Sequence, residues 1–172
     1  MSGRLVLYFS VYGTAKRVAE EIAFQTGADL LAIEPAVPYG KDRSHYIDLA
    51  RRAQREHDQQ LRPMILNPLS VAPYDEIFLG YPIWWGIAAW PVNQFVTGND
   101  FTGKAVIPFC TSASSGLGQS GTLLAEAAGT GEWLEGARFS YGTEEADVQA
   151  WISGLTESIA QAIEQAQAVT KD

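Results

Sequence analysis

The feature that most constrains the fold is a repeated alternation of short apolar runs with stretches of helical periodicity. Five apolar runs predict strands, and these lie at residues 5–9, 29–34, 76–80, 104–110 and 137–140. Helical patterns follow them at residues 14–26, 44–58, 90–96, 116–128 and 144–168. Because the strands are apolar almost throughout, they indicate a parallel sheet that helices cover on both faces. The sequence therefore predicts an α/β fold, an open three-layer α/β/α sandwich with a five-stranded parallel sheet.

One residue does not suit this pattern. Pro108 lies within the run 104–110, which we expect inside the sheet. A proline has no N–H and cannot donate a ladder hydrogen bond there. We therefore expect Pro108 to mark a bulge or the end of regular pairing, just before a loop at residues 111–118.

Length and charge limit the function classes. The chain of 172 residues suits one domain, residues 1–172, with a sizeable core. Its formal net charge of -8 argues against nucleic acid as the main partner. The same charge suits plain solubility, and an acidic surface could also steer docking to a basic protein. No apolar run reaches membrane-spanning length and no secretory leader is visible, so we expect no membrane insertion and a cytoplasmic location.

Three loops follow predicted strands at one edge of the sheet. In open parallel sheets, ligands bind outside the carboxyl ends of the strands. The loops at that edge are residues 10–16, 80–86 and 111–118, and they are rich in Gly, Ser, Thr or Trp. We therefore expect the functional site there.

The first loop, "SVYGTAK", ends at the start of a predicted helix. Unpaired amides and the helix dipole favour an anion at such a place. Gly13 would let the backbone approach the anion closely, Ser10 and Thr14 could add hydroxyl groups, and Lys16 could add charge. The spacing matches neither a Walker loop nor G-x-G-x-x-G. The plain alternative is a helix capped by Thr14 after a tight turn at Gly13.

The second and third loops suit a flat ligand. The second, "GYPIWWG", carries two adjacent tryptophans on which an aromatic ligand could stack, although both could equally pack in the core. The third, "CTSASSGLGQS", could bring backbone amides to a flat ring, or be a Ser-rich turn before a helix. Cys110, the single cysteine, is interpreted as a small buried residue, and His45 and His57 as surface residues. No acid–base, nucleophile or metal-ligand spacing stands out, which suits a bound cofactor that carries the chemistry.

Four motifs together resemble a known family. They are "YFS" followed by Gly13 and Lys16, "IEP" at residues 33–35, "FLGYPIWWG" at 78–86 and "PFCTSASSGLGQS" at 108–120. With them the chain resembles the flavodoxins, of the short-chain type, over roughly residues 4–160. The resemblance implies a flavodoxin-like sheet with strand order 2-1-3-4-5 and FMN bound without a covalent link.

The resemblance also implies the cofactor-binding residues. The FMN phosphate would lie on Ser10, Val11, Tyr12, Gly13, Thr14, Ala15 and Lys16. The isoalloxazine ring would lie between Pro82, Ile83, Trp84, Trp85 and Gly86 on one side and Thr111, Ser112, Ser115, Gly116, Leu117 and Gly118 on the other. Trp84 is preferred over Trp85 as the residue that stacks on the ring. No catalytic residue and no metal ligand is implied.

The first loop departs from the family pattern. Tyr12 replaces a small hydroxyl residue, Thr14 stands where the family usually has Asn, and Ala15 lacks a hydroxyl group. A hydrogen bond to a charged group contributes about 1.5–3 kcal/mol. The loss of two would weaken binding by about 100-fold. We expect FMN to bind through the remaining amides, with lower affinity.

Three functions stay open at this point. The first is an electron-transfer protein that docks a redox partner through acidic residues, namely Glu132, Glu135, Glu144, Glu145 and Asp147. The second is an FMN-dependent NAD(P)H oxidoreductase that reduces a quinone or another small electron acceptor. It would need a second pocket, which residues 36–73 could build with Tyr39, His45 and Arg51. The third is an interaction module that has lost FMN, as Tyr12 and Ala15 suggest.

Overall fold

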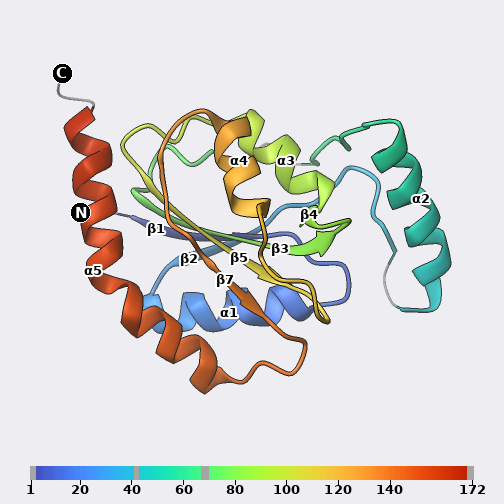
Figure 1. Cartoon of the computed structure of the whole chain (residues 1–172), viewed down its shortest axis with the longest axis horizontal. Helices are drawn as coiled ribbons and strands as arrows, with labels where there is room; N and C mark the ends of the chain where they lie inside the picture. Colours follow the sequence, from blue (N-terminus) through green and yellow to red (C-terminus); the bar gives the residue numbers. More distant parts are fainter. Residues whose placement is uncertain (1–2, 41–42, 67–69, 170–172) are drawn as a thin grey trace.

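The computed structural model describes residues 3–40, 43–66 and 70–169, and contains a twisted sheet between layers of helices (Figure 1). The strands are β1 (Arg4–Tyr8), β2 (Asp29–Ala32), β3 (Glu76–Trp84), β4 (Ile87–Ala88), β5 (Ala105–Thr111), β6 (Glu132–Trp133) and β7 (Ala137–Phe139). The helices are α1 (Thr14–Thr26), α2 (Tyr46–Asp58), α3 (Trp90–Thr97), α4 (Ser120–Ala128) and α5 (Glu145–Val169), and a 3₁₀ turn, η1 (Arg43–His45), precedes α2.

The sheet has the predicted parallel order. Its strands run β2-β1-β3-β5-β6, and β7 also pairs with β5 in parallel. Counting β5 as the fourth strand and β6 with β7 as the fifth, this is the order 2-1-3-4-5. The sheet has seven strands rather than five, for two reasons. The two-residue β4 folds back on β3 as an antiparallel hairpin, and the fifth position is divided into β6 and β7.

Alternating side chains of the strands build a core on each face of the sheet. In β1, Val6 packs in the cluster beneath α1 and α5, whereas Leu5 and Leu7 pack in the cluster beneath α3 and α4. Successive strand residues point to opposite faces, so an apolar run without polar gaps is needed where both faces are covered. This confirms the three-layer sandwich that the apolar runs predict.

Helix α2 stands apart from these layers. Figure 1 shows it beyond the carboxyl ends of β1 and β3 rather than over a face of the sheet. The Trp90 indole Nε1 of α3 donates to the main-chain oxygen of Ala53 at 3.1 Å and so ties α2 to the body of the protein. This position makes α2 a side wall at the edge where the predicted loops gather.

The bulge expected at Pro108 lies in the neighbouring strand. Pro108 keeps regular register with β3 on one side. On the other side, the pairs Val106–Trp133 and Phe109–Ala137 leave three residues of the fifth strand opposite two of β5. The main-chain oxygen of Val106 accepts a hydrogen bond from the fifth strand. Residues two apart in a strand point their backbone groups to the same side, so the N–H that Pro108 lacks would also face the interruption in the fifth strand. The proline is tolerated inside the sheet because its neighbour bulges.

Two loop boundaries differ from the prediction. Strand β3 continues through Trp84 because Ile83 and Trp84 pair with β4, so the loop predicted at 80–86 shrinks to the turn Trp85–Gly86. Helix α4 begins at Ser120 rather than at 116, after Gly118 adopts a positive φ of 54°. Neither change moves these residues away from the carboxyl edge of the sheet.

Candidate functional site

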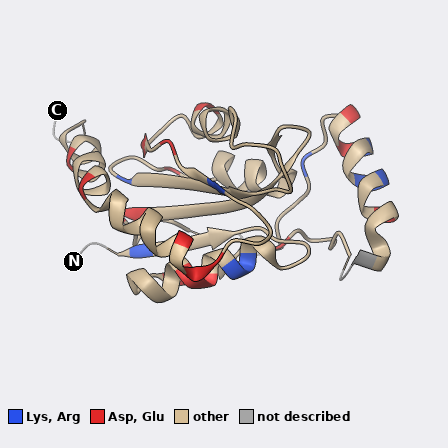
Figure 2. Ribbon diagram, turned by 60° about the horizontal axis from the view of Figure 1, so that its bottom comes forward, with Lys and Arg blue, Asp and Glu red and all other residues tan. Residues whose placement is uncertain are grey.

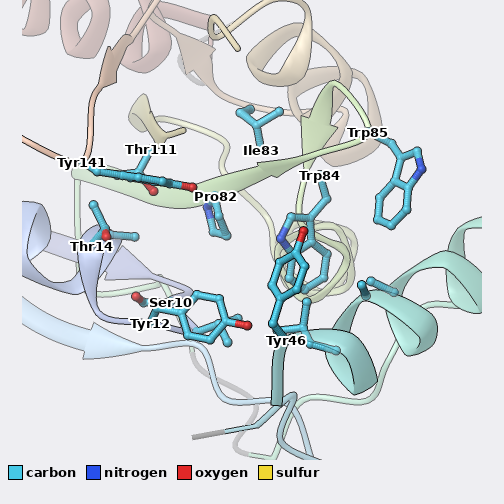
Figure 3. Close-up of a pocket in the computed structure, with 15 residues that line it drawn as sticks. Ser10, Tyr12, Thr14, Tyr46, Pro82, Ile83, Trp84, Trp85, Thr111 and Tyr141 are labelled. Atoms are coloured by element: carbon cyan, nitrogen blue, oxygen red, sulfur yellow. The ribbon is translucent and has the colours of Figure 1, made fainter. Parts of the chain in front are cut away.

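A cavity of about 640 Å³ opens at the carboxyl ends of β1, β3 and β5 (Figure 3). The predicted residues that line it are Ser10, Val11, Tyr12, Thr14, Ala15, Pro82, Ile83, Trp84, Trp85 and Thr111. Five residues that the sequence did not indicate also line it, namely Tyr46, Leu49, Ala50, Ala53 and Tyr141. The predicted residues outside its lining are Gly13, Lys16, Gly86, Ser112, Ser115, Gly116, Leu117 and Gly118.

The start of α1 forms one side of the cavity. Gly13 is the N-cap, with a φ of 95° that disfavours any side chain, and its N–H donates to Ser10 Oγ at 3.0 Å. The interpretation of Thr14 as the cap is wrong, because Thr14 is the first helical residue and no side chain caps the helix. The first turn also has no acidic residue. The first-turn amides of α1 therefore present a positive helix end to the cavity.

Tyr141 covers this helix start from the loop after β7. Arg17 of α1 holds that loop, because its guanidinium donates to the main-chain oxygens of Thr143 at 2.6 Å and Tyr141 at 3.1 Å. Figure 3 places the Tyr141 ring beside Thr14, with Tyr12 on the other side of the helix start. The carboxyl-edge rule that indicated three loops applies equally to this fourth loop, and would have found Tyr141.

The two tryptophans have different environments. Trp84 is half-buried, with its ring edge-on to Phe9 at 5.6 Å and to Tyr39 at 5.0 Å between centroids. Trp85 is 49% exposed and stacks on His57 of α2 at 5.3 Å. Trp85 and Gly86 both have positive φ, 49° and 79°, as a two-residue type I′ hairpin turn requires. Trp84 is thus packed against other aromatic rings and Trp85 is exposed, and both line the cavity.

Helix α2 supplies the wall opposite the helix start. Its lining residues, Tyr46, Leu49, Ala50 and Ala53, follow the spacing of one helix face. Tyr46 is 59% exposed, and Figure 3 shows its ring directed into the cavity near Trp84. The apolar spacing alone could not show that this face borders a cavity, since it would equally suit a face packed on the sheet.

None of the three residues expected to build a pocket from 36–73, namely Tyr39, His45 and Arg51, lines this cavity. Residues 41–42 and 67–69 of that segment lie outside the described residues, and Arg51 is exposed. His45 is the N-cap of α2 and does not line this cavity. Tyr39 is buried and donates its hydroxyl to Glu56 Oε2 at 2.6 Å. The segment supplies Tyr46 to this cavity, and Tyr39 lines a separate cavity together with Pro38 and Gly40.

A buried network fixes α2 to the segment after β2. The carboxylate of Glu56 accepts from Tyr39 and, at 2.6 Å, from Arg52 Nε, while the Arg52 guanidinium lies 3.8 Å from the centre of the Tyr39 ring. Burial raises the pKa of Tyr39 well above its usual value, and its hydrogen bond to Glu56 raises that pKa further. Tyr39 therefore stays protonated and keeps donating at any ordinary pH. The network gives the wall a fixed position.

The third loop is held by hydrogen bonds within the protein. Ser112 Oγ accepts from Arg138 Nε at 2.9 Å and donates to the main-chain oxygen of Ser115. Arg138 Nη2 donates to the main-chain oxygens of Ser112 and Ala113. The hydroxyl of Ser112 is therefore used inside the loop, and among the six predicted residues of this loop only Thr111 lines the cavity.

The acidic residues expected near the later loops are divided between two ends of the sheet. Glu144, Glu145 and Asp147 lie at the start of α5, next to the Tyr141 loop (Figure 2). Glu132 pairs with Ala105 at the amino end of β5, which is the opposite edge. Glu135 lies in the bulge between β6 and β7. Part of the expected acidic group thus follows the Tyr141 loop, whereas Glu132 lies at the opposite edge of the sheet.

Cys110 is expected to be unreactive in the folded protein. It is fully buried in β5, and burial raises the pKa of its thiol to about 12, against the opposing charge of Arg138. Because the thiolate is the reactive form, native protein should not react with a disulfide reagent at about pH 8, whereas denatured protein should react fully. The absorbance of the thiolate that the reagent releases measures the reaction of the native and of the denatured protein. Rapid reaction of the native protein would contradict a buried, inert thiol.

In the described part of the chain, no helix is long and apolar enough to cross a membrane, and no group of three or more His, Cys, Asp or Glu could hold a metal ion. The site is instead a cavity at the point where strand order reverses, between a helix start and aromatic rings. A parallel sheet of order 2-1-3-4-5 with its cavity at that switch point defines the flavodoxin-like class of doubly wound α/β proteins.

The chain belongs to the flavodoxin family, whose family model matches residues 3–162. The structure is similar to a proposed flavoprotein from Bacteroides eggerthii DSM 20697, at 36% identity over 93% of this chain and 99% of that one, with a TM-score of 0.78. A second proposed flavoprotein, from Bacteroides uniformis ATCC 8492, is 34% identical over 88% of this chain and 98% of that one, with a TM-score of 0.79.

A more distant structure shares the fold. It is a flavoprotein in complex with FMN from Lactobacillus acidophilus NCFM, at 22% identity over 88% of this chain and 99% of that one, with a TM-score of 0.63. Among curated proteins, no significant match to the sequence is found. The match of the family model to residues 3–162 confirms the family resemblance of the four sequence motifs.

Proposed function

We propose that this protein binds FMN without a covalent link and uses it for electron transfer. The observation that carries the proposal is that four exposed aromatic side chains, Tyr12, Tyr46, Trp85 and Tyr141, all line one cavity. Exposed rings gathered at one place indicate a binding surface, and rings prefer to stack on a flat partner. An isoalloxazine ring is such a partner.

The start of α1 suits the phosphate of FMN. It has neither a side-chain cap nor an acidic residue in its first turn, so its amides are available to an anion. Ala15 is buried at 2% exposure, and its missing hydroxyl leaves these amides unchanged. Tyr12, which replaces a small hydroxyl residue, lines the cavity with its aromatic ring. We therefore expect binding to persist despite the altered loop.

Bound FMN would supply the redox chemistry, in one- or two-electron steps. The protein's own residues would hold the phosphate at α1, cover the ring with aromatic side chains, and keep water from the side closed by Trp84. The complex of the Lactobacillus acidophilus flavoprotein with FMN supports this assignment for the fold. The electrons would pass to a redox partner protein or to a small electron acceptor.

A second candidate is an FMN-dependent NAD(P)H oxidoreductase acting on a quinone or similar acceptor. The observation that favours it is the wall of α2, which stands beyond the sheet edge and directs Tyr46 into the cavity. A second flat molecule could lie against this ring. Rapid oxidation of NADH or NADPH by the FMN-loaded protein would favour the enzyme, and salt-dependent transfer to a partner protein would favour the carrier.

The first test is an absorption spectrum of purified protein, incubated with excess FMN and then freed of unbound flavin. We expect bands at about 370 and 450 nm, which belong to bound oxidised flavin, with about one FMN per chain. A colourless protein would contradict the proposal, and the interaction module without FMN would then be the better description.

A further inference from the structure

The turn at residues 140–143 connects β7 to α5 and is held against the start of α1. The Thr143 N–H donates to the main-chain oxygen of Ser140 at 3.1 Å, so Tyr141 and Gly142 lie at the tip of the turn. Thr143 is buried, whereas the Tyr141 side chain is 53% exposed and lines the cavity. The turn is therefore anchored at its base and presents one aromatic side chain to the cavity.

Arg17 fixes this turn from α1. Its guanidinium donates to the main-chain oxygens of both Thr143 and Tyr141. A planar guanidinium can hold two acceptors at once in a fixed geometry, whereas an ammonium group is a point charge. The helix dipole disfavours a cation near the amino end of a helix, and the two hydrogen bonds offset this cost. Arg17 therefore restricts the position of the turn that carries Tyr141.

The cavity itself has no cationic side chain for a phosphate. Among the described residues that line it, none carries a formal charge on its side chain. Lys16 lies outside the lining, and its ammonium is 3.9 Å from the carboxylate of Glu20. Amide and hydroxyl groups alone would therefore hold a phosphate here, and Ala15 contributes no hydroxyl. Figure 3 shows Tyr141 beside Thr14, where it adds a ring and a phenol hydroxyl to the helix start.

We propose that Tyr141 contacts the phosphate end of bound FMN and that Arg17 is the residue that positions it. This inference rests on the FMN site proposed above. A tyrosine at the tip of a free turn would lose conformational freedom when the ligand binds, which lowers affinity. A turn that Arg17 already holds has lost this freedom on folding. Arg17 acts through Tyr141 because Arg17 itself does not line the cavity.

The test is a double-mutant cycle on the flavin-free protein, with affinities for FMN and for riboflavin measured by the change in flavin fluorescence. Tyr141→Leu and Arg17→Met should each weaken FMN binding by about 10-fold. The double variant should also lose about 10-fold, rather than the roughly 100-fold that two independent effects would give. Riboflavin, which has no phosphate, should lose about two-fold at most in each variant.

Two further variants separate position from charge. Arg55→Met removes the same charge from an exposed arginine of α2 that lies outside the cavity lining, and should leave the FMN affinity unchanged. Arg17→Lys keeps the charge without the planar fork, and should recover only part of the FMN affinity that Arg17→Met loses. Full recovery in Arg17→Lys would show that charge alone is sufficient, and the positioning role of Arg17 would fail.

The remaining outcomes also decide the inference. A loss of about 100-fold in the double variant would show that Arg17 acts independently of Tyr141, and would overturn the positioning role. An unchanged FMN affinity in Tyr141→Leu, or an equal loss of FMN and riboflavin, would overturn the contact with the phosphate end while leaving the FMN function intact. Failure of the unchanged protein to bind FMN would overturn the proposed function, and this inference with it.

Discussion

Replacement of Thr14 by Glu is expected to weaken FMN binding by about 100-fold or more while leaving the fold intact. Thr14 is the first residue of α1 and lines the cavity. A carboxylate there would lie next to the phosphate, and two such charges about 4 Å apart repel by about 4 kcal/mol at the dielectric of a protein surface. Screening by solvent reduces this value, and a loss of about 2.7 kcal/mol already corresponds to 100-fold.

The same substitution should not destabilise the helix. An acidic residue in the first turn interacts favourably with the helix dipole, by about 0.3–1 kcal/mol. The first turn of α1 has no acidic residue, so the gain is available. Thermal unfolding of the flavin-free variant should therefore occur at the same temperature as in the unchanged protein, or slightly above it.

Two controls make this prediction specific. Thr14→Gln adds the same length without the charge and should weaken FMN binding far less than Thr14→Glu. Riboflavin, which has no phosphate, should bind Thr14→Glu and the unchanged protein about equally. Equal loss of riboflavin and FMN in Thr14→Glu would show that the substitution distorts the ring site, and the assignment of the phosphate to α1 would then fail.

The part of the site on the loops after β1, β3 and β5 could be predicted because it follows from local pattern. Apolar runs locate the strands, and parallel strands bring their carboxyl ends to one edge. The residues Ser10, Pro82 and Thr111 therefore come together without knowledge of long-range packing. The strand order, in contrast, follows only from the family resemblance, since periodicity does not determine which strands are neighbours.

The contribution of α2 could not be predicted from the same patterns. Its apolar spacing fits a helix over the sheet, yet the helix stands beyond the sheet edge (Figure 1). Contacts distant in sequence decide this, such as Trp90 with Ala53 and Tyr39 with Glu56. The aromatic wall of Tyr46 is consequently a property of tertiary packing.

Pro108 illustrates a limit of a different kind. A proline within a predicted strand signals an irregularity in pairing, and such an irregularity is present. The signal cannot tell which of two paired strands bulges, because the hydrogen bond that the proline cannot make would have joined both strands. Gly136 in the neighbouring strand resolves this, with a φ of 87° that a side chain disfavours.

Gly136→Ala is expected to lower the free energy of unfolding by about 3 kcal/mol or more. A Cβ at position 136 would lie 2.2 Å from the main-chain oxygen of Pro108, and this oxygen belongs to a central strand that cannot move freely. The substitution therefore adds a steric overlap, about 1–3 kcal/mol for an overpacked core, to the strain of a positive φ, about 1–2 kcal/mol.

Gly129→Ala separates these two contributions. Gly129 has a similar positive φ, 73°, but a Cβ there would meet no atom within 4 Å. This control should therefore lose only about 1 kcal/mol. Urea unfolding of the flavin-free variants measures both values. Equal losses at the two positions would mean that β5 shifts to admit the methyl group, and that the bulge does not depend on a glycine.

The predicted loss at Gly136 has a consequence for the site. The bulge sets the register of β7, and Arg138 of β7 holds the third loop through Ser112 and Ala113. At a denaturant concentration where Gly136→Ala is still folded, its FMN affinity should fall, whereas that of Gly129→Ala should not. An unchanged FMN affinity in the folded Gly136→Ala variant would show that the loop keeps its position without the bulge, and that Arg138 does not transmit strand register to the cavity.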